Sequence, residues 1–308
     1  MNNLRVAGAA AAVLMLSSTA AFADTAVSVN CVATHFGSGQ TNCSGNGGAG
    51  SEGGYQSGAT KTASGSAIGA NGYTATMSAR ASYGSLGISG DLSGSSNALI
   101  GGAPLFRVDG TSHAEWTDGF TIVVPGQANG TSALVKVTQI IDIHDLSATV
   151  GGLYPTTSSK VSFFSSVKNS DVSLANACGT ASASTLGQDA QCQSNTTLLH
   201  VGRNVIEQQI LLPVGQIRYL TAVLDGVSIY YNPYASALST GSTSFDAFNT
   251  AHTYLTVLTP DGSVTSTSGQ SYVLPAIPEP ATWALLLTGF GAIGSRLRRR
   301  VGRGLRTA

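Results

Sequence analysis

Alternation of apolar and polar residues at every second position is the pattern that most constrains the fold of this chain. It is clearest from Leu134 to His144, where Val135, Val137, Ile141 and Ile143 share one parity, and Lys136, Thr138, Asp142 and His144 share the other. Successive side chains of a strand point to opposite faces of its sheet, so this segment predicts a strand with one buried face.

Other segments follow the same pattern, and turn residues separate several of them. The predicted strands are residues 72–83, 120–124, 134–144, 204–214, 217–231, 245–258 and 263–273. Pro213 with Gly215 and Pro260-Asp261-Gly262 are typical turn sequences. No fixed repeat and no convincing helix occur between the two ends of the chain. We therefore predict an all-β fold, an antiparallel, jelly-roll-like β-sandwich spanning residues 24–275.

The composition of this body refines the prediction. From Gly37 to Gly72, 18 of 36 residues are Gly or Ser, which predicts a loop-like segment that buries little surface. The body carries eight basic residues against fourteen acidic ones. Nucleic-acid binding requires a basic surface, so the charge balance argues against a nucleic-acid partner.

The N-terminal segment has the three parts of a secretory signal peptide. Arg5 supplies the positive charge, Val6 to Leu16 is apolar, and Ala21-Phe22-Ala23 matches the small-x-small rule for cleavage. We expect signal peptidase to remove residues 1–23, leaving Asp24 at the mature N-terminus and the body outside the cytoplasm.

The C-terminal segment also has three parts in a fixed order. Pro278-Glu279-Pro280 cannot lie inside a helix, because each proline fixes φ and lacks an N–H donor. An apolar run from Ala281 to Gly294 follows, short of the roughly 20 residues that span a bilayer. Six arginines then occupy positions 296, 298, 299, 300, 303 and 306. By the positive-inside rule, Arg296, Arg298, Arg299 and Arg300 stop transfer and stay in the cytoplasm.

This arrangement resembles the PEP-CTERM sorting signal in its Pro-Glu-Pro-x-x-Trp-Ala form, with Pro278, Glu279, Pro280, Trp283 and Ala284 at the motif positions. The resemblance covers residues 276–308, with the motif at 278–284, a transmembrane helix at 281–295 and an Arg-rich tail at 296–306. It implies export by a Gram-negative bacterium, a transient stay in the inner membrane, processing by an exosortase, and association with exopolysaccharide at the cell surface or outside the cell.

Four cysteines remain in the exported body: Cys31, Cys43, Cys178 and Cys192. An even number of cysteines in an oxidising compartment predicts disulfides. Pairing of sequence neighbours, Cys31 with Cys43 and Cys178 with Cys192, is the simplest arrangement. On the chain-entropy model, each loop would contribute roughly 3 kcal/mol.

No motif assigns catalysis or a resident metal. The five histidines form no His-Glu-x-x-His pair, and no Gly-x-Ser-x-Gly nucleophile elbow occurs. Asp142 and His144 are one candidate acid–base pair, with a solvated polar strand face as the favoured alternative. Calcium is the better ionic hypothesis, although the aspartates beside glycines in apparent turns usually bond their own backbone. These aspartates are Asp109, Asp118, Asp225 and Asp261.

Four aromatic side chains are the candidates for sugar binding. They are Trp116, Tyr230, Tyr231 and Tyr234, although aromatic rings more often pack in a core. The sequence thus predicts a non-enzymatic surface or extracellular-matrix protein. A carbohydrate-binding module of the cell surface is the first alternative, and a secreted hydrolase is the second.

Overall fold

The computed structural model describes residues 23–35, 39–42, 51–56, 61–68, 74–96, 106–152, 155–169, 172–184, 196–232, 239–274 and 290. Residue contacts divide the chain into two units, Met1–Tyr272 and Val273–Ala308. The first unit contains all the strands of the described residues, and the fold below is that of this unit. The predicted signal peptide, apart from Ala23, and the predicted sorting segment, apart from Phe290, lie outside the described residues.

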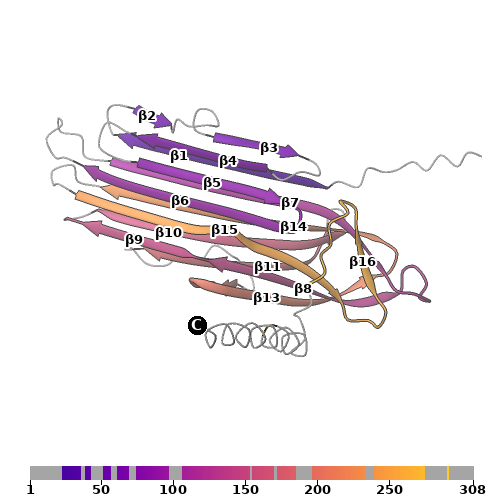
Figure 1. Cartoon of the computed structure of the whole chain (residues 1–308). Coiled ribbons are helices and arrows are strands. Elements are labelled where there is room, and N and C mark those ends of the chain that lie inside the picture. Colours follow the sequence, from indigo (N-terminus) through magenta and orange to yellow (C-terminus); the bar gives the residue numbers. More distant parts are fainter. Residues whose placement is uncertain are drawn as a thin grey trace, which may run out of the picture. The chain divides into compact units, whose positions relative to one another are not determined.

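The described body is all-β, as predicted, and its strands form two mostly antiparallel sheets (Figure 1). Sheet A has the order β12-β11-β10-β14-β7-β1-β2, with β3 also paired to β1 and β16 to β7. Its strands are β1 (Asp24–His35), β2 (Gly39–Asn42), β3 (Ser51–Gln56), β7 (Phe106–Val123), β10 (Thr156–Asn169), β11 (Val172–Ser184), β12 (Thr196–Leu198), β14 (Ile217–Asn232) and β16 (Ser263–Ser266).

Sheet B has the order β13-β8-β15-β6-β5-β4, with β9 also paired to β15. Its strands are β4 (Lys61–Ile68), β5 (Thr74–Ser82), β6 (Ser85–Ser96), β8 (Ser132–Ile143), β9 (Asp145–Gly151), β13 (Gly202–Pro213) and β15 (Ser239–Val257). The single parallel pairing between named strands in the described region joins β11 and β12.

The predicted period-two strands occur where the pattern was strongest. In β8 the inward residues Val135, Val137, Ile141 and Ile143 are all buried in the core. The turn after β15 is confirmed by Asp261, whose φ is +59°, and by the bond from Gly262 N to Thr259 O of 3.1 Å. The predicted strand at 120–124 is only the end of the 18-residue β7, whose earlier half is too polar to be recognised by apolar alternation.

The prediction of a loop-like segment at 37–72 is wrong for its described parts. β2, β3 and β4 all lie within it. β3 pairs with β1 from Thr25 opposite Gln56 to Asn30 opposite Ser51, and β4 pairs with β5. The hydrogen bonds to neighbouring strands are formed by backbone groups and do not depend on the glycine and serine side chains. Tertiary context therefore overrides the local propensity of these residues for loops.

Glycines let large rings from one sheet reach the backbone of the other. Phe245 of β15 lies between Gly90 of β6 and Gly226 of β14, where an added Cβ would stand 2.3 Å and 2.2 Å from the ring. Tyr230 of β14 covers Gly94 and Gly241 in the same way, at 2.8 Å and 2.5 Å. The high glycine content therefore has a packing role in this core.

Candidate functional site

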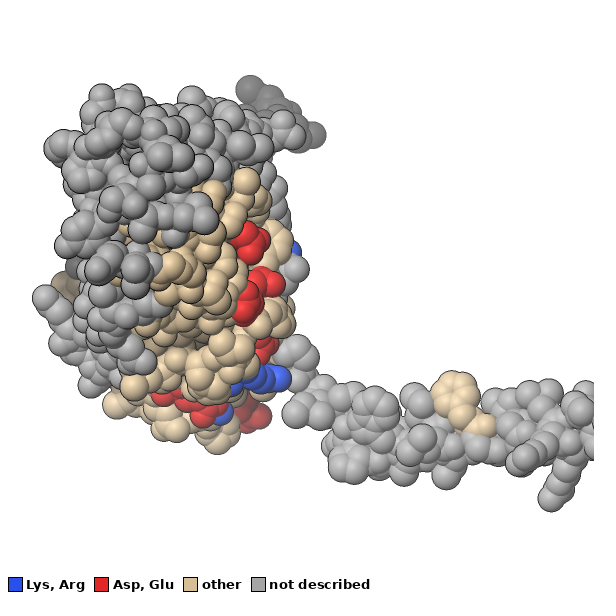
Figure 2. All heavy atoms as spheres, turned by 90° about the vertical axis from the view of Figure 1, so that its left-hand side faces the viewer, with Lys and Arg blue, Asp and Glu red and all other residues tan. Residues whose placement is uncertain are grey.

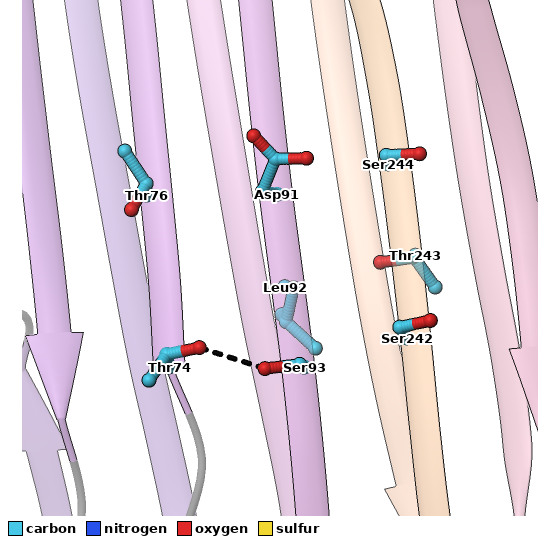
Figure 3. A pocket seen from close by; sticks show the side chains of 8 residues that line it. All are labelled: Thr74, Thr76, Asp91, Leu92, Ser93, Ser242, Thr243 and Ser244. Carbon is cyan, nitrogen blue, oxygen red and sulfur yellow. Dashed lines mark hydrogen bonds between the residues drawn. The ribbon is translucent and has the colours of Figure 1, made fainter.

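A shallow groove on the outer face of sheet B is the candidate binding site. It has a volume of about 240 Å³, and its lining residues come from β5, β6 and β15. Figure 3 shows them as Thr74, Thr76, Asp91, Leu92, Ser93, Ser242, Thr243 and Ser244. We call this set the hydroxyl groove. Leu92 and Thr243 are buried, so the other six residues supply its polar surface.

Strand register arranges these six side chains in two rows. Thr76, Asp91 and Ser244 are cross-strand neighbours in one row, and Thr74, Ser93 and Ser242 in the next. All six belong to alternate, outward positions of their strands, as the groove in Figure 3 shows. The result is a surface of short hydroxyl side chains around a single carboxylate.

The rows continue onto β9. Ser147 Oγ is 2.6 Å from Ser244 Oγ, and Thr149 Oγ1 is 2.7 Å from Ser242 Oγ. Ser244 Oγ also donates to the carboxylate of Asp145. Several hydroxyls are thus already oriented by neighbouring strands, which reduces the entropy lost when they bind a ligand.

Asp91 is the electrostatic centre of the groove. Its pKa is raised above its usual value, first by partial desolvation and then by the negative charges of Asp145 and Asp246. None of the described residues that line the groove is Lys or Arg. Figure 2 shows acidic side chains gathered along one side of the described surface. An anionic ligand would be repelled here, whereas a neutral or cationic ligand would not.

A second polar cluster lies on the outer face of sheet A. His113 of β7 places Nδ1 2.6 Å from Asp225 Oδ1 of β14, and Nε2 3.6 Å from Glu115 Oε2. The hydrogen bond to Asp225, followed by the interaction with Glu115, raises the pKa of His113 to about 9. The imidazole is therefore protonated at neutral pH and holds two strands together by charge.

This cluster resembles a catalytic triad only in its residue types. Ser28 of β1 is the cross-strand neighbour of His113, so serine, histidine and aspartate occupy adjacent strands in one row. A general base must accept a proton from the serine, and a protonated imidazole cannot do so. Its Nε2 also faces Glu115. The arrangement favours structural ion pairing over nucleophilic catalysis.

The His113 cluster predicts a pH-dependent stability. Because the pKa of His113 is about 9 when folded against 6.5 ordinarily, its stabilisation is complete below pH 6.5 and is lost as pH rises through 9. The side chain is 34% exposed, so screening limits the loss to about 1–2 kcal/mol. Urea denaturation at a series of pH values measures this loss.

In that experiment, His113→Gln is expected to flatten the dependence of the free energy of unfolding on pH between neutral pH and pH 9. The exposed His200 provides a matched control, and His200→Gln should leave the slope unchanged. A wild-type slope identical to that of His113→Gln would refute the assignment.

The calcium candidates do not occupy turns as predicted, except for Asp261. Asp109 and Asp118 lie within β7, and Asp225 lies within β14. Asp109 is paired with Arg107 at 2.7 Å, and Asp225 is paired with His113. In the part of the chain that the structure describes, no three His, Cys, Asp or Glu side chains are grouped to hold a metal ion.

Asp118 is buried and anchors the end of the body. Its Oδ1 accepts bonds from Thr267 Oγ1 at 2.7 Å and Ser268 N at 3.1 Å, and its Oδ2 accepts from Tyr272 Oη at 2.7 Å and from Ser268 Oγ. Burial and the charge of Asp118 raise the pKa of Tyr272, so the phenol stays neutral as a donor. We call residues 263–272 the closing arm.

Two of the four aromatic sugar-binding candidates are contradicted. Trp116 and Tyr230 are both 0% exposed, so a sugar cannot stack on either ring. Trp116 stacks on Tyr272 with ring centroids 5.6 Å apart, and the Tyr230 hydroxyl lies 2.9 Å from Ser239 Oγ. Tyr231 is half-buried on the outer face of sheet A, and Tyr234 lies outside the described residues.

The remaining predicted sites have mixed outcomes. Asp142 and His144 make no hydrogen bond with each other among the described contacts, and His144 is exposed just beyond β8. Cys31 and Cys178 are not free thiols, whereas Cys43 and Cys192 lie outside the described residues. The same holds for Ala21, Pro278, Glu279, Pro280, Trp283, Ala284, Arg296, Arg298, Arg299 and Arg300. No helix among the described residues is long and apolar enough to cross a membrane.

Neither the hydroxyl groove nor the His113 cluster was expected from the sequence. One available signal was the alternation of Arg107, Asp109, His113 and Glu115, all of one parity, which is what a polar strand face produces. The hydroxyl groove left no such signal, because serine and threonine are common throughout the chain. Comparison of the chain with protein-family models, with curated proteins and with solved structures finds no match.

Proposed function

We propose that this chain is an exported, non-enzymatic surface or matrix protein that binds extracellular polysaccharide through the hydroxyl groove. The observation that carries the proposal is the lining of that groove, six outward polar side chains in two rows around Asp91. Sugars present rows of hydroxyls that can donate to a carboxylate and exchange bonds with serine and threonine.

The charge of the groove narrows the polymer class. Asp91, Asp145 and Asp246 lie close enough together to raise the pKa of Asp91. A polyuronate would add further negative charge to this surface, which costs free energy. Neutral or amino-sugar polymers are therefore favoured over acidic ones.

Affinity electrophoresis tests this proposal. We expect a neutral glucan in the gel to retard the protein, and a polyuronate to leave its mobility unchanged. Asp91→Ala should weaken binding about tenfold, since a hydrogen bond to a charged group contributes about 1.5 kcal/mol or more. Thr76→Val, which removes one hydroxyl at nearly constant shape, should weaken it less.

Asp142→Ala is the matched control, because it removes the same charge from the outer face of sheet B outside the groove. If the gel polymer retards wild type and Asp91→Ala equally, the groove is not the binding site. If no neutral polymer retards the wild type, the proposed polysaccharide binding is wrong.

The route to the cell surface is the second part of the proposal. The signal peptide at 1–23 and the segment at 276–308 support export, a transient inner-membrane precursor and exosortase processing. The jelly-roll-like connectivity and the two terminal helices expected from the sequence belong to this proposal as well.

Replacement of Pro278-Glu279-Pro280 by three alanines should leave a full-length, membrane-bound precursor, because a helix-compatible sequence removes the extended segment that a protease reads. Immunoblots of cell fractions measure the size and location of the chain. Pro275→Ala changes a proline outside the motif and should be processed as the wild type is. Normal processing of the triple-alanine variant would exclude the sorting role.

Sheet order supports the proposed disulfides of the exported form. β1 and β11 are four strand spacings apart in sheet A, about 19 Å, so Cys31 cannot reach Cys178. Val32 lies opposite Asn42, and Cys31 and Cys43 are their neighbours in the sequence. Peptide mapping without reductant should recover Cys31–Cys43 and Cys178–Cys192.

A further inference from the structure

An unpaired edge of sheet B is the basis of this inference. β13 ends the sheet and hydrogen-bonds along its length to β8 on one side. No residue in the described region forms a backbone hydrogen bond with its other side. With 12 residues it is longer than the other strands that end the two sheet paths, β2 with 4, β4 with 8 and β12 with 3.

Another edge in the same body, the free side of β9, is protected. The free side of β9 accepts bonds from two hydroxyls of β10, Ser159 Oγ to Ser147 O at 2.9 Å and Thr157 Oγ1 to Thr149 O at 3.3 Å. Among the described residues, β13 has no comparable protection beyond its first residue, where Gly202 O accepts a bond from Asn204 Nδ2 at 3.0 Å. It contains no lysine and no internal proline, two devices that prevent edge pairing, and Glu207, one of its two charged residues with Arg203, pairs with Lys136 of β8 at 3.0 Å.

The outward face of β13 carries apolar residues at both ends of the strand. Val205 is 50% exposed and Leu211 is 68% exposed. Their cross-strand neighbours on β8 are also apolar, Ile140 beside Val205 and Leu134 beside Leu211. Glu207 and Gln209 lie between them, so the outward residues from Val205 to Leu211 are apolar, polar, polar and apolar in order.

We propose that β13 pairs with β13 of a second copy of this chain, antiparallel, around a two-fold axis at Gln208. This axis places Val205 of each copy opposite Leu211 of the other, and Glu207 opposite Gln209. Leu134, Leu211 and the partner's Val205 and Ile140 then form one continuous apolar row across the joint sheet, and symmetry provides the row twice.

The charge of Glu207 favours the register with its axis at Gln208 over the register shifted by two residues. A slip of two residues, with the axis at Glu207, puts Glu207 opposite Glu207, and like charges directly opposite destabilise a strand pair. That slip also places Val205 against Gln209 instead of Leu211. The axis at Gln208 additionally allows residues 203–213 to pair, almost the whole strand, so backbone hydrogen bonding favours it as well.

Disulfide trapping tests the register. Full-length chain carrying Val205→Cys, mixed in mild detergent with chain carrying Leu211→Cys, should form a covalent dimer on mild oxidation. Either variant oxidised alone should remain largely monomeric on a non-reducing gel, because each new cysteine would then face the native Leu211 or Val205. Equal cross-linking of all three samples, or of none, would overturn the pairing.

Sedimentation velocity of the full chain tests the interface itself. We expect a dimer that dissociates on dilution, and Val205→Lys should raise the dissociation constant at least about tenfold, since two apolar pairs are lost and an edge lysine opposes pairing. Val172→Lys, on an exposed valine of β11, is the matched control and should leave it unchanged. A wild type that stays monomeric at every concentration, or dimers insensitive to Val205→Lys, would refute the proposal.

Discussion

Asp118→Ala is expected to lower the free energy of unfolding of the body by about 3–5 kcal/mol. The substitution removes the acceptor for Thr267, Ser268 and Tyr272. The buried Tyr272 hydroxyl left without a partner costs about 1–3 kcal/mol, and each hydrogen bond lost by the more exposed Thr267 and Ser268 contributes about 1 kcal/mol. For a body of this size, a loss of 3 kcal/mol corresponds to a fall in Tm of about 6–12 °C. Thermal unfolding followed by circular dichroism measures it.

The same variant should release the closing arm before the rest of the body unfolds. Thr267 N also bonds Gly119 O at 2.8 Å, and Leu255 N bonds Tyr272 O at 2.8 Å, so the arm keeps some attachment. Amide hydrogen exchange should therefore accelerate in residues 263–272 while β8 stays protected. Asp109→Ala, on the outer face of the same strand, is the control. An unchanged Tm for Asp118→Ala would show that the carboxylate does not anchor the arm.

Gly226→Ala is expected to destabilise the body by about 2–3 kcal/mol through overpacking. Its new Cβ would lie 2.2 Å from Phe245 Cε2 and 2.9 Å from Ile88 Cδ1. Gly226 has no left-handed backbone conformation, so the effect isolates the clash from backbone strain. Urea denaturation gives the change in free energy.

A second substitution separates packing from other causes. Phe245→Leu in the Gly226→Ala background should restore part of the loss, giving a coupling energy of about 1 kcal/mol or more. Gly126→Ala is the complementary control, because its Cβ would meet nothing within 4 Å but its φ is +78°, which costs about 1 kcal/mol. Strictly additive effects of Gly226→Ala and Phe245→Leu would contradict the assigned contact.

The proposed groove and the proposed dimer edge are compatible. The hydroxyl groove lies over β5, β6 and β15, whereas the dimer edge is β13, on the far side of β8. A dimer would therefore present two grooves on one extended sheet face. A polymer with many equivalent sites could bind both at once, and its avidity would exceed the affinity of a single groove.

Local patterns in the sequence determined the class of fold and much of the core. Alternation in β8 identified Val135, Val137, Ile141 and Ile143 as inward residues, and the turn at Asp261 followed from residue types alone. These features depend on near neighbours along the chain, because strand periodicity and turn geometry are properties of a few consecutive residues.

Only the tertiary structure decided which strands became neighbours, and every candidate site depends on that choice. His113 meets Asp225 across 112 positions of sequence, and Asp118 meets Tyr272 across 154. The tertiary structure also buried Trp116 and Tyr230, because these positions of their strands face the opposite sheet. The physical reason is that strand pairing joins distant segments through backbone bonds common to all residues, so side-chain patterns along one strand do not specify its partner.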